Sequence, residues 1–315
     1  MPSNKSFIMP QKRVSFKHRL EYALFAAFIA TSKYVPGWSA RVEAKLLNFL
    51  LKKGSRKHAR LIRQNVDMAF PGDTPEFRRD LQNKIYSHFG RVFVEITRTF
   101  ARRKPESILA RSRILNPEVL ERALQKKRGL IVFSAHFGNW EWIPLILHSR
   151  LNQDIHSIAR PMDNPLIEKK VKQFREAMGS EIIYKQGSLR TILNRLASNG
   201  IIYLLIDQNT VSREGVFVDF FGQKASTVTT VAQLYLKKNI PVVPVFLHYE
   251  GPQVVLEVLP EIAYVRGDNE TDDLVALTQY LTGLIEKQIR RFPEQWLWFH
   301  DRWKTKPQGA THESP

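Results

Sequence analysis

The sequence predicts an α/β fold, a mainly parallel sheet flanked by helices, with a helical membrane-associated region at its N-terminus. From residue 129 onward, short apolar runs typical of buried strands alternate with segments whose apolar residues recur every three or four positions. Such alternation places successive strands in one sheet and covers its faces with helices. Between residues 40 and 112 only the helical periodicity is present, so we separate a helical region from the α/β core.

The first 40 residues combine positive charge with one apolar run, at 22–30. Lys33 interrupts the run and the Pro-Gly-Trp sequence at 36–38 ends it. Counted to Trp38 the segment has about 17 residues, the lower limit for a spanning helix. Basic residues resume directly afterwards. Positive charge on both flanks favours an interfacial or re-entrant anchor on an anionic membrane surface over a single span, and a cleaved signal peptide is the third alternative.

Residues 41–112 are expected to form helices that pack on the core. Two apolar faces show helical spacing, and Pro71-Gly72-Asp73 and Pro75 separate them. The first face comprises Val42, Leu46, Leu47, Phe49 and Leu50, and the second Ile85, Phe89, Val92, Phe93 and Ile96.

Residues 113–304 are assigned to the α/β core and residues 305–315 to a disordered tail. Strands are expected at 130–134, 154–159, 181–184, 201–206, 242–248 and 254–259. Helices are expected near 139–150, 165–178, 188–198, 228–238 and 271–291. The last helix is the best marked, because six Leu and Ile residues line one of its faces.

The charge balance predicts an anionic partner. The chain has 315 residues, with 48 Lys and Arg against 30 Asp and Glu, a net charge of +18. It contains no cysteine, which excludes disulfides, thiolate catalysis and cysteine-ligated zinc. Positive charge is densest beside the apolar run, and no RNA- or DNA-binding motif is present. We therefore expect an anionic membrane surface and phosphorylated substrates as partners, and no nucleic acid.

A candidate catalytic pair follows the strand at 130–134. His136 comes at the carboxyl end of this strand and Glu141 in the first turn of the next helix, so the two side chains can meet across one turn. A carboxylate that accepts a proton from one imidazole nitrogen leaves the other nitrogen free as a base. Gly138 and Asn139 provide backbone freedom and a helix cap. The alternative is a turn histidine beside a solvated glutamate.

Two further strands also end in polar residues. Arg160 follows the strand at 154–159, and Asp207-Gln208 follow the strand at 201–206. Ligands gather at the carboxyl ends of strands in such sheets, so these side chains suggest a cleft with a base, a cation and an acid. Taken singly, Arg160 is equally explained as a turn salt bridge and Asp207 as a loop cap. Nucleotide-binding, nucleophile-elbow and zinc motifs are absent, and the histidines lack metal-ligand spacing, so we expect no metal and no cofactor.

Several distinctive motifs occur in order between residues 15 and 304. They are RQNVDMAFPG, HFGRVFVE, HFGNWE, RPMDNP, the Asp-Gln pair with GVFVDFFG and AST, and WLWFHDRW. Together they resemble one family, the lauroyl and myristoyl transferases that carry out late acylation of lipid A, which is similar in turn to the wider superfamily of acyltransferases with a His-x₄-Asp/Glu motif. The resemblance implies a glycerol-3-phosphate-acyltransferase-like fold and an enzyme on the cytoplasmic face of the bacterial inner membrane.

The resemblance also implies a reaction and a set of site residues. A fatty acyl group moves from acyl carrier protein to a hydroxyl of a phosphorylated lipid A precursor. The motif histidine matches His136, and Glu141 matches the acidic residue, for which glutamate is the usual form in this branch. Arg175 matches an important arginine and Asp207 the later acid. The expected catalytic residues are therefore His136, Glu141, Arg175 and Asp207, and the expected substrate-binding residues Asn139, Arg160, Asn164 and Gln208.

In this scheme His136, oriented by Glu141, removes the proton of the acceptor hydroxyl. Arg175, or backbone N–H groups near Gly138 and Asn139, then stabilise the oxyanion. An acyl-CoA-dependent phospholipid or glycolipid acyltransferase is the alternative enzyme. A membrane scaffold or a nucleic-acid-binding protein is the non-enzymatic alternative.

Two aromatic groups near the C-terminal end have two interpretations each. The phenylalanines at 217, 220 and 221 are expected in the core, with the wall of an acyl-chain tunnel as the alternative. Trp296, Trp298 and Trp303, with Arg302 and Lys304, are expected either at lipid headgroups or beneath the final helix.

Overall fold

The computed structural model describes residues 14–34, 39–54, 56–102 and 104–307. The basic residues before Val14, the Pro-Gly-Trp break and most of the predicted tail therefore lie outside the described residues. Thr305 is held by hydrogen bonds to Asn209 and Thr210, so the packed chain continues past Lys304.

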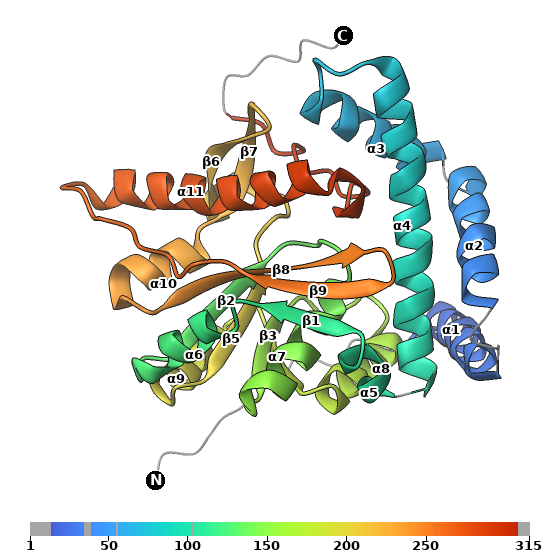
Figure 1. Cartoon of the computed structure of the whole chain (residues 1–315), viewed down its shortest axis with the longest axis horizontal. Helices are drawn as coiled ribbons and strands as arrows, with labels where there is room; N and C mark the ends of the chain where they lie inside the picture. Colours follow the sequence, from blue (N-terminus) through green and yellow to red (C-terminus); the bar gives the residue numbers. More distant parts are fainter. Residues whose placement is uncertain (1–13, 35–38, 55, 103, 308–315) are drawn as a thin grey trace.

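The described residues form an α/β fold with a mainly parallel central sheet, as predicted (Figure 1). The seven strands lie in the order β1-β9-β8-β2-β5-β3-β4, and neighbours are parallel except β8 and β9. Their bounds are β1 Ser112–Leu115, β2 Leu130–Ser134, β3 Ile155–Ala159, β4 Ser180–Tyr184, β5 Ile201–Leu205, β8 Val242–Glu250 and β9 Gln253–Val258. A separate antiparallel pair comprises β6 Gly215–Phe220 and β7 Gln223–Val228.

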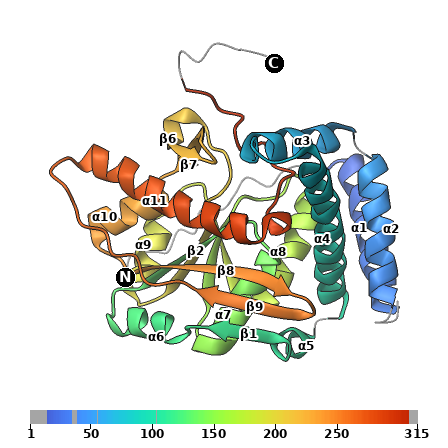
Figure 2. The same cartoon turned by 45° about the horizontal axis from the view of Figure 1, so that its top comes forward.

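Helices cover both faces of the sheet (Figures 1 and 2). The core on one face lies against α9 Leu189–Ala197, α10 Thr230–Lys238 and α11 Glu270–Arg291. The core on the other face lies against α6 Glu118–Gln125, α7 Ile143–Leu151 and α8 Pro165–Ala177. Short 3₁₀ helices are η2 Trp140–Trp142, η3 Ser212–Glu214 and η4 Pro293–Gln295.

The N-terminal region is helical, as expected. Its helices are α1 Phe16–Tyr34, α2 Ala40–Gly54, α3 Arg56–Ala69, α4 Pro75–Arg102 and α5 Pro105–Leu109. The long helix α4 runs along one side of the sheet, and α1 and α2 lie outside it (Figure 1). Arg98 of α4 pairs with Glu43 of α2 at 2.5 Å, and the ring of Phe25 on α1 meets Phe100 of α4 edge-on.

Apolar side chains on the outer surface of α1 and α2 are exposed. On α1 they recur every four residues, so they form one stripe: Phe16, Leu20, Leu24 and Phe28. On α2 the exposed set is Val42, Leu46 and Phe49, and Phe93 of α4 is also exposed. The predicted α2 face is therefore largely exposed rather than packed on the core. None of the described helices has both the length and the apolar character needed to cross a bilayer.

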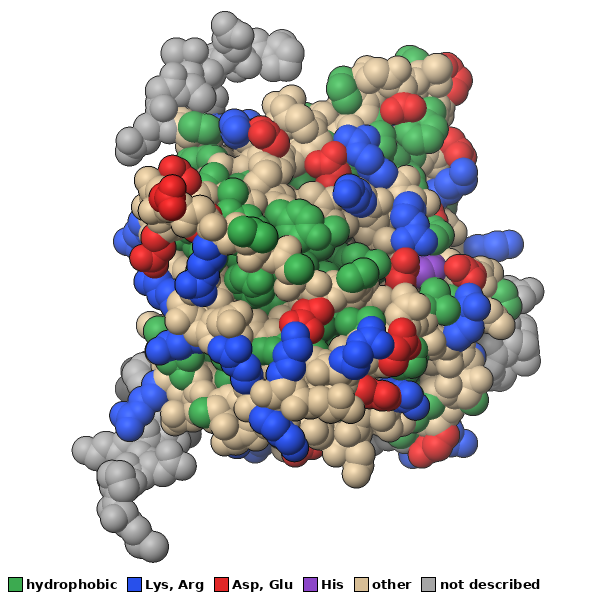
Figure 3. Space-filling view, turned by 60° about the vertical axis from the view of Figure 1, so that its left-hand side comes forward, with side chains coloured by type: hydrophobic (Ala, Val, Ile, Leu, Met, Phe, Trp, Pro, Cys, Tyr) green, Lys and Arg blue, Asp and Glu red, His purple; other side chains and the backbone are tan. Residues whose placement is uncertain are grey.

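The structure also decides between two alternatives and adds elements that the sequence pattern did not reveal. Trp296, Trp298, Trp303 and Arg302 are all at most 2% exposed, so the interior packing is confirmed and the position at lipid headgroups is wrong. The elements β1, β6, β7 and α6 were not predicted, because all four are short and β7 is largely polar. The excess positive charge is spread over the surface, as Figure 3 shows for one face, where Lys and Arg surround a central hydrophobic area.

Candidate active site

The register between β2 and β5 brings two polar residues face to face. Leu130 pairs with Ile201, and the pairing continues with the same offset to Ser134 and Leu205. Two residues farther along each chain come His136 and Asp207, which therefore lie opposite one another beyond the carboxyl ends of the strands. Both side chains belong to the strand ends where ligands gather in parallel sheets.

His136 and Asp207 form a hydrogen-bonded pair. The ring nitrogen Nδ1 of His136 lies 2.8 Å from Oδ1 of Asp207, and the backbone N–H of His136 donates to Oδ2 at 3.0 Å. The indole Nε1–H of Trp296 donates to the same Oδ2 at 2.8 Å. Burial raises the pKa of Asp207, but the charge of His136 and these hydrogen bonds outweigh it and hold the pKa below its ordinary value. The carboxylate is therefore ionised, and its hydrogen bond to Nδ1 fixes the orientation of the imidazole ring.

The structure corrects the expected pairing of His136 with Glu141. Glu141 instead accepts two hydrogen bonds from Arg175, from Nε at 2.9 Å and from Nη2 at 2.5 Å. Burial alone raises the pKa of Glu141, but the adjacent Arg175 guanidinium lowers it below its usual range. Asp207 is therefore the carboxylate that orients His136, and Glu141 positions Arg175. The turn after β2 directs Glu141 toward α8, because it continues into η2 rather than closing back on the histidine.

The segment after α11 holds the histidine turn in place. Leu297 N–H donates to the carbonyl of His136 at 3.0 Å, and Gly138 N–H donates to the carbonyl of Gln295 at 2.8 Å. Gly138 has φ of +58°, and a Cβ there would lie 1.9 Å from the Leu247 carbonyl oxygen. Only glycine fits this position. Because its N–H is already bonded, Gly138 cannot serve as the oxyanion donor that the sequence suggested.

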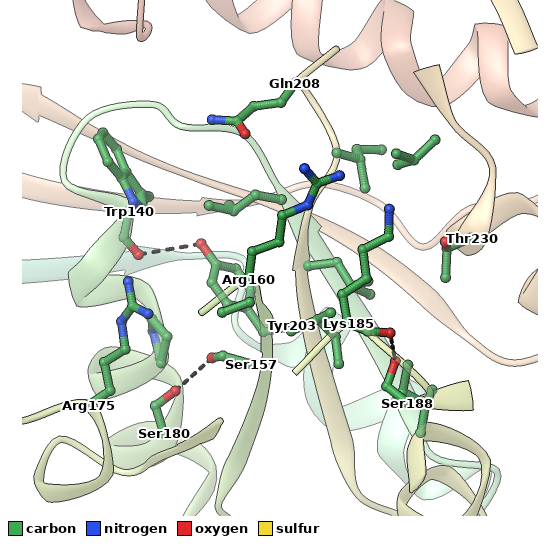
Figure 4. Close-up of a pocket in the computed structure, with 18 of the residues that line it drawn as sticks. Trp140, Ser157, Arg160, Arg175, Ser180, Lys185, Ser188, Tyr203, Gln208 and Thr230 are labelled. Carbon is green, nitrogen blue, oxygen red and sulfur yellow. Dashed lines mark hydrogen bonds between the residues drawn. The ribbon is translucent and has the colours of Figure 1, made fainter. Parts of the chain in front are cut away.

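A cavity of about 700 Å³ extends from His136 into the fold (Figure 4). It opens where β3 and β5 separate: their pairing ends at Ser157 and Tyr203, whereas β3 stays paired with β4 to Ala159. Residues beyond this point on both strands line the cavity. Helices α7, α8, α9 and α10, the end of β7 and the segments after β2 and β4 also contribute to the lining, whose apolar members include Pro144, Phe174, Met178, Ile192 and Val228. A partly apolar cavity that reaches a histidine is suited to an amphiphilic substrate.

The cavity is bordered by the His136–Asp207 pair and by the Glu141–Arg175 pair. His136, Glu141 and Arg175 line it, whereas Asp207 lies behind the histidine and is buried. Trp140 lies beside His136, with ring centroids 5.1 Å apart, and its carbonyl accepts from the Tyr203 hydroxyl at 3.4 Å. Burial raises the pKa of Tyr203 well above its ordinary value, so this phenol stays protonated.

Of the four expected substrate-binding residues, Arg160 and Gln208 line the cavity. The amide Nε2 of Gln208 lies 3.3 Å from Nε2 of His136, so it contacts the nitrogen that Asp207 leaves free. Asn139 is fully buried outside the lining and makes no cap hydrogen bond, so it neither lines the site nor caps the helix as expected.

Asn164 has a structural role instead of the expected contact with substrate. Its Oδ1 accepts from Leu166 N–H and Ile167 N–H, which caps α8. Its Nδ2 donates to the carbonyl of His18 and to Glu21, both on α1, at 2.9 Å. Asn164 therefore fastens the N-terminus of α8, the helix that carries Arg175, to α1.

Aromatic residues follow the core interpretation. Phe220 and Phe221 are at most 4% exposed and do not line the cavity, which confirms that they pack in the core, whereas Phe217 is half-buried and lies neither in the core nor in the cavity lining. The phenylalanine that does line the cavity is Phe174 of α8, stacked on Phe100 of α4 with ring centroids 3.8 Å apart. The sequence did not predict Phe174 as a cavity residue or Trp296 as the partner of Asp207. Spacing gives no signal for them, because each contact joins segments far apart in the chain.

Comparison with known proteins adds a family likeness. A family model described as bacterial lipid A biosynthesis acyltransferase matches residues 9–305. The lipid A biosynthesis lauroyltransferase of Escherichia coli K12 is 23% identical over 81% of this chain and 82% of its own length. The palmitoleoyltransferase of lipid A biosynthesis from the same organism is 25% identical over 86% of this chain and 85% of its own length. A phosphatidylinositol mannoside acyltransferase of Mycolicibacterium smegmatis is 25% identical over 60% of this chain and 62% of its own length.

Replacing Trp296 by Phe tests whether its indole holds Asp207 ionised. Trp296 and Trp298 are both buried, but the Trp298 indole donates to the Pro293 carbonyl and does not contact Asp207. We expect Trp296→Phe to lower the free energy of unfolding by about 1.5–3 kcal/mol near neutral pH, the usual contribution of a hydrogen bond to a charged group.

The pH dependence separates this effect from simple loss of packing. A depressed carboxyl pKa contributes stability above about pH 4, the ordinary range for Asp, and this contribution is lost as the pH falls through the folded-state pKa. In denaturant unfolding, the deficit of Trp296→Phe should therefore shrink in acid, while that of Trp298→Phe stays constant. Parallel pH profiles for the two variants would contradict the assigned contact.

Proposed function

The chain belongs to the bacterial lipid A biosynthesis acyltransferase family, and from this premise we propose that it transfers a fatty acyl group from acyl carrier protein to a hydroxyl of a phosphorylated lipid A precursor. The observation that supports this reaction most directly is the Asp207–His136 pair at the cavity. An alcohol attacks a thioester only when a base removes its proton, and an oriented imidazole is the usual protein base for that step.

The pair determines which nitrogen acts. The ionised carboxylate of Asp207 accepts the Nδ1–H of His136, so the lone pair remains on Nε2. In the structure the Gln208 amide donates toward Nε2. The entering hydroxyl takes this place and gives its proton to Nε2, while its oxygen forms a bond to the thioester carbonyl carbon. The carbonyl electron pair moves to oxygen and produces a tetrahedral oxyanion.

Arg175 is the proposed stabiliser of that oxyanion. Two of its nitrogens are bonded to Glu141, which fixes the plane of the guanidinium beside the cavity. Within the described residues its Nη1 makes no hydrogen bond, so it can donate to the substrate. When the oxyanion collapses, the carbon–sulfur bond breaks and the leaving thiolate takes the proton from Nε2. The ester forms and the thiol is released, so the transfer consumes only the two substrates.

The cavity supports an acyl-chain site. Its volume of about 700 Å³ lies within the usual range for sites that enclose small ligands, and apolar residues of β5, α8 and α9 line its interior. The opening between β3 and β5 lets a chain pass between strands while its carbonyl stays near His136. The excess of positive charge suits an acidic carrier protein and a phosphorylated acceptor.

We also propose that the enzyme binds the cytoplasmic face of the inner membrane through α1 and α2. The exposed stripe of α1 is rich in Phe and Leu, and the exposed Lys17 and Arg19 lie in its first turn. This combination favours an anionic lipid surface. The α1 helix is joined to the site, because Asn164 bonds it to α8, and Phe25, Phe100 and Phe174 are in successive ring contact. A lipid acceptor at the membrane is therefore close to the helix that carries Arg175.

A glycolipid acyltransferase is the second candidate function. The similarity to a phosphatidylinositol mannoside acyltransferase favours it, although that match covers less of this chain than the two described from Escherichia coli. The two candidates share the same base and differ in acceptor and donor.

The reaction is tested with purified enzyme, acyl carrier protein loaded with fatty acids of several lengths, and a lipid A precursor without secondary chains. Mass spectrometry should show the precursor gaining one acyl group. His136→Ala should lower the rate by about a hundred- to ten-thousandfold, the usual contribution of a general base. His148→Gln is the control, because His148 is a partly exposed residue of α7 outside the cavity lining.

Full activity in His136→Ala would contradict the assignment. Acylation of phosphatidylinositol mannoside from acyl-CoA, with none of the lipid A precursor, would replace the first candidate function by the second.

Membrane binding is tested by placing a charge in the α1 stripe. Leu24→Glu should weaken binding to phosphatidylglycerol-containing vesicles roughly tenfold or more, because burial of one leucine side chain contributes about 1.5–3 kcal/mol. Val265→Glu is the control, since Val265 is also an exposed aliphatic residue, 91% exposed against 65% for Leu24, but lies in the loop before α11. Co-sedimentation with vesicles measures both. If both substitutions weakened vesicle binding equally, or if neither weakened it, α1 would not be the membrane-binding element.

A further inference from the structure

Two cations stand side by side at one end of the cavity. The register of β3 and β4 pairs Ala159 with Tyr184, so the next residues, Arg160 and Lys185, leave the sheet together. The backbone N–H of Lys185 donates to the Ala159 carbonyl at 3.0 Å, and the Ser188 hydroxyl donates to the Lys185 carbonyl at 2.8 Å. These bonds fix the backbone beneath both side chains. Figure 4 shows the Arg160 and Lys185 side chains extending in the same direction across the cavity.

One carboxylate faces this cationic pair. Glu214 of η3 lies with Oε2 3.0 Å from Nζ of Lys185. The hydrogen bond and charge of Lys185 lower the pKa of Glu214, and the charges of Arg160 and Arg213 lower it further. Three positive groups from three segments therefore surround a single negative group. Arg160 and Lys185 line the cavity, whereas Arg213 and Glu214 lie outside its lining.

The charges in this cluster are not balanced by the protein. Among the residues that the structure describes, the guanidinium of Arg160 makes no hydrogen bond and no close ion pair, although it lines the cavity that contains His136. Arg175, the other arginine of the lining, is paired with Glu141 through its Nε and Nη2. Arg160 is exposed, so its guanidinium is open to solvent and, beside the Lys185 ammonium group, is free to bind an anion that enters the cavity.

We propose that Arg160 and Lys185 bind a phosphate group of a substrate, and that Glu214 occupies the phosphate position until the substrate displaces it. The inference rests on the proposed function for the identity of the substrate. The planar fork of arginine suits two phosphate oxygens and the lysine ammonium suits a third. The polar lining nearby, from Ser188, Thr230 and Gln233, suits a sugar or pantetheine portion rather than an acyl chain. The cavity thus has a phosphate end and an apolar end.

The first experiment measures phosphate binding without catalysis. Inorganic phosphate is titrated into the full-length protein and followed by ³¹P NMR. We expect Arg160→Gln and Lys185→Gln each to weaken binding roughly tenfold, the scale of one hydrogen bond to a charged group. Glu214→Gln should tighten binding roughly two- to fivefold, because it removes an exposed competing ion pair.

Arg190→Gln is the matched control. Arg190 is an exposed residue of α9 near this cluster in sequence, and it does not line the cavity. It should leave phosphate binding unchanged. Equal weakening by Arg190→Gln and Arg160→Gln would show general attraction to a basic protein and overturn the site. Unchanged or weaker binding in Glu214→Gln would overturn the role of that carboxylate.

The second experiment identifies which substrate carries the phosphate. KM values are measured for the lipid A precursor with and without its phosphates, and for acyl donors with and without the phosphate of phosphopantetheine. If the acceptor supplies the group, Arg160→Gln raises the KM of the phosphorylated acceptor about tenfold and leaves that of the dephosphorylated one unchanged. If the donor supplies it, the same pattern appears with the donor pair.

If Arg160→Gln raised KM just as much when neither substrate carried a phosphate, the result would contradict the proposal. Absence of acyl transfer in the wild-type enzyme would refute the proposed function alone, since the NMR titration decides the phosphate site independently.

Discussion

The hydrogen bond between Asp207 and His136 is the interaction on which the site depends, and a sheet register produces it. The strands β2 and β5 pair with a fixed offset, so their polar continuations meet at the same edge. An ionised carboxylate in the interior is costly unless it is well bonded. Here the ring and backbone of His136 and the indole of Trp296 supply the bonds. A single geometry therefore satisfies the buried acid and orients the base.

Two distant parts of the chain support this pair from opposite sides. The segment after α11 binds the histidine turn through backbone hydrogen bonds and supplies Trp296. In the same segment Arg302 is fully buried and donates to the Ser226 carbonyl, and burial lowers its pKa to about 10. On the other side, α8 carries Arg175 and the cavity wall, and Asn164 fastens that helix to α1. The segment after α11 and the helices α8 and α1, which are far apart in the sequence, therefore all support the site.

The sequence predicted the parts of the fold that local patterns determine. Apolar runs located β2, β3, β4, β5, β8 and β9, because a strand buried on both faces needs a continuous apolar segment. Strand β1 was missed because it is short and partly exposed, and β7 because it is largely polar; β6 is short, and its phenylalanines were interpreted only as core or tunnel residues. Strand-end reasoning also located His136, Arg160, Asp207 and Gln208. It could not show which carboxylate faces His136, since that depends on β2 lying next to β5 rather than on spacing along the chain. Glu141 is close in sequence but bonds Arg175, and Asn164 lies in a motif but caps a helix.

The most direct test is the protonation state of the two ring nitrogens of His136, read by ¹⁵N NMR of the labelled imidazole in its neutral form. Orientation by Asp207 predicts a proton on Nδ1 and a free lone pair on Nε2 in the wild-type protein and in Glu141→Gln, and loss of this preference in Asp207→Asn. A proton on Nε2 in the wild-type protein, or a tautomer that changes in Glu141→Gln but not in Asp207→Asn, would contradict the assignment of Asp207 as the orienting carboxylate.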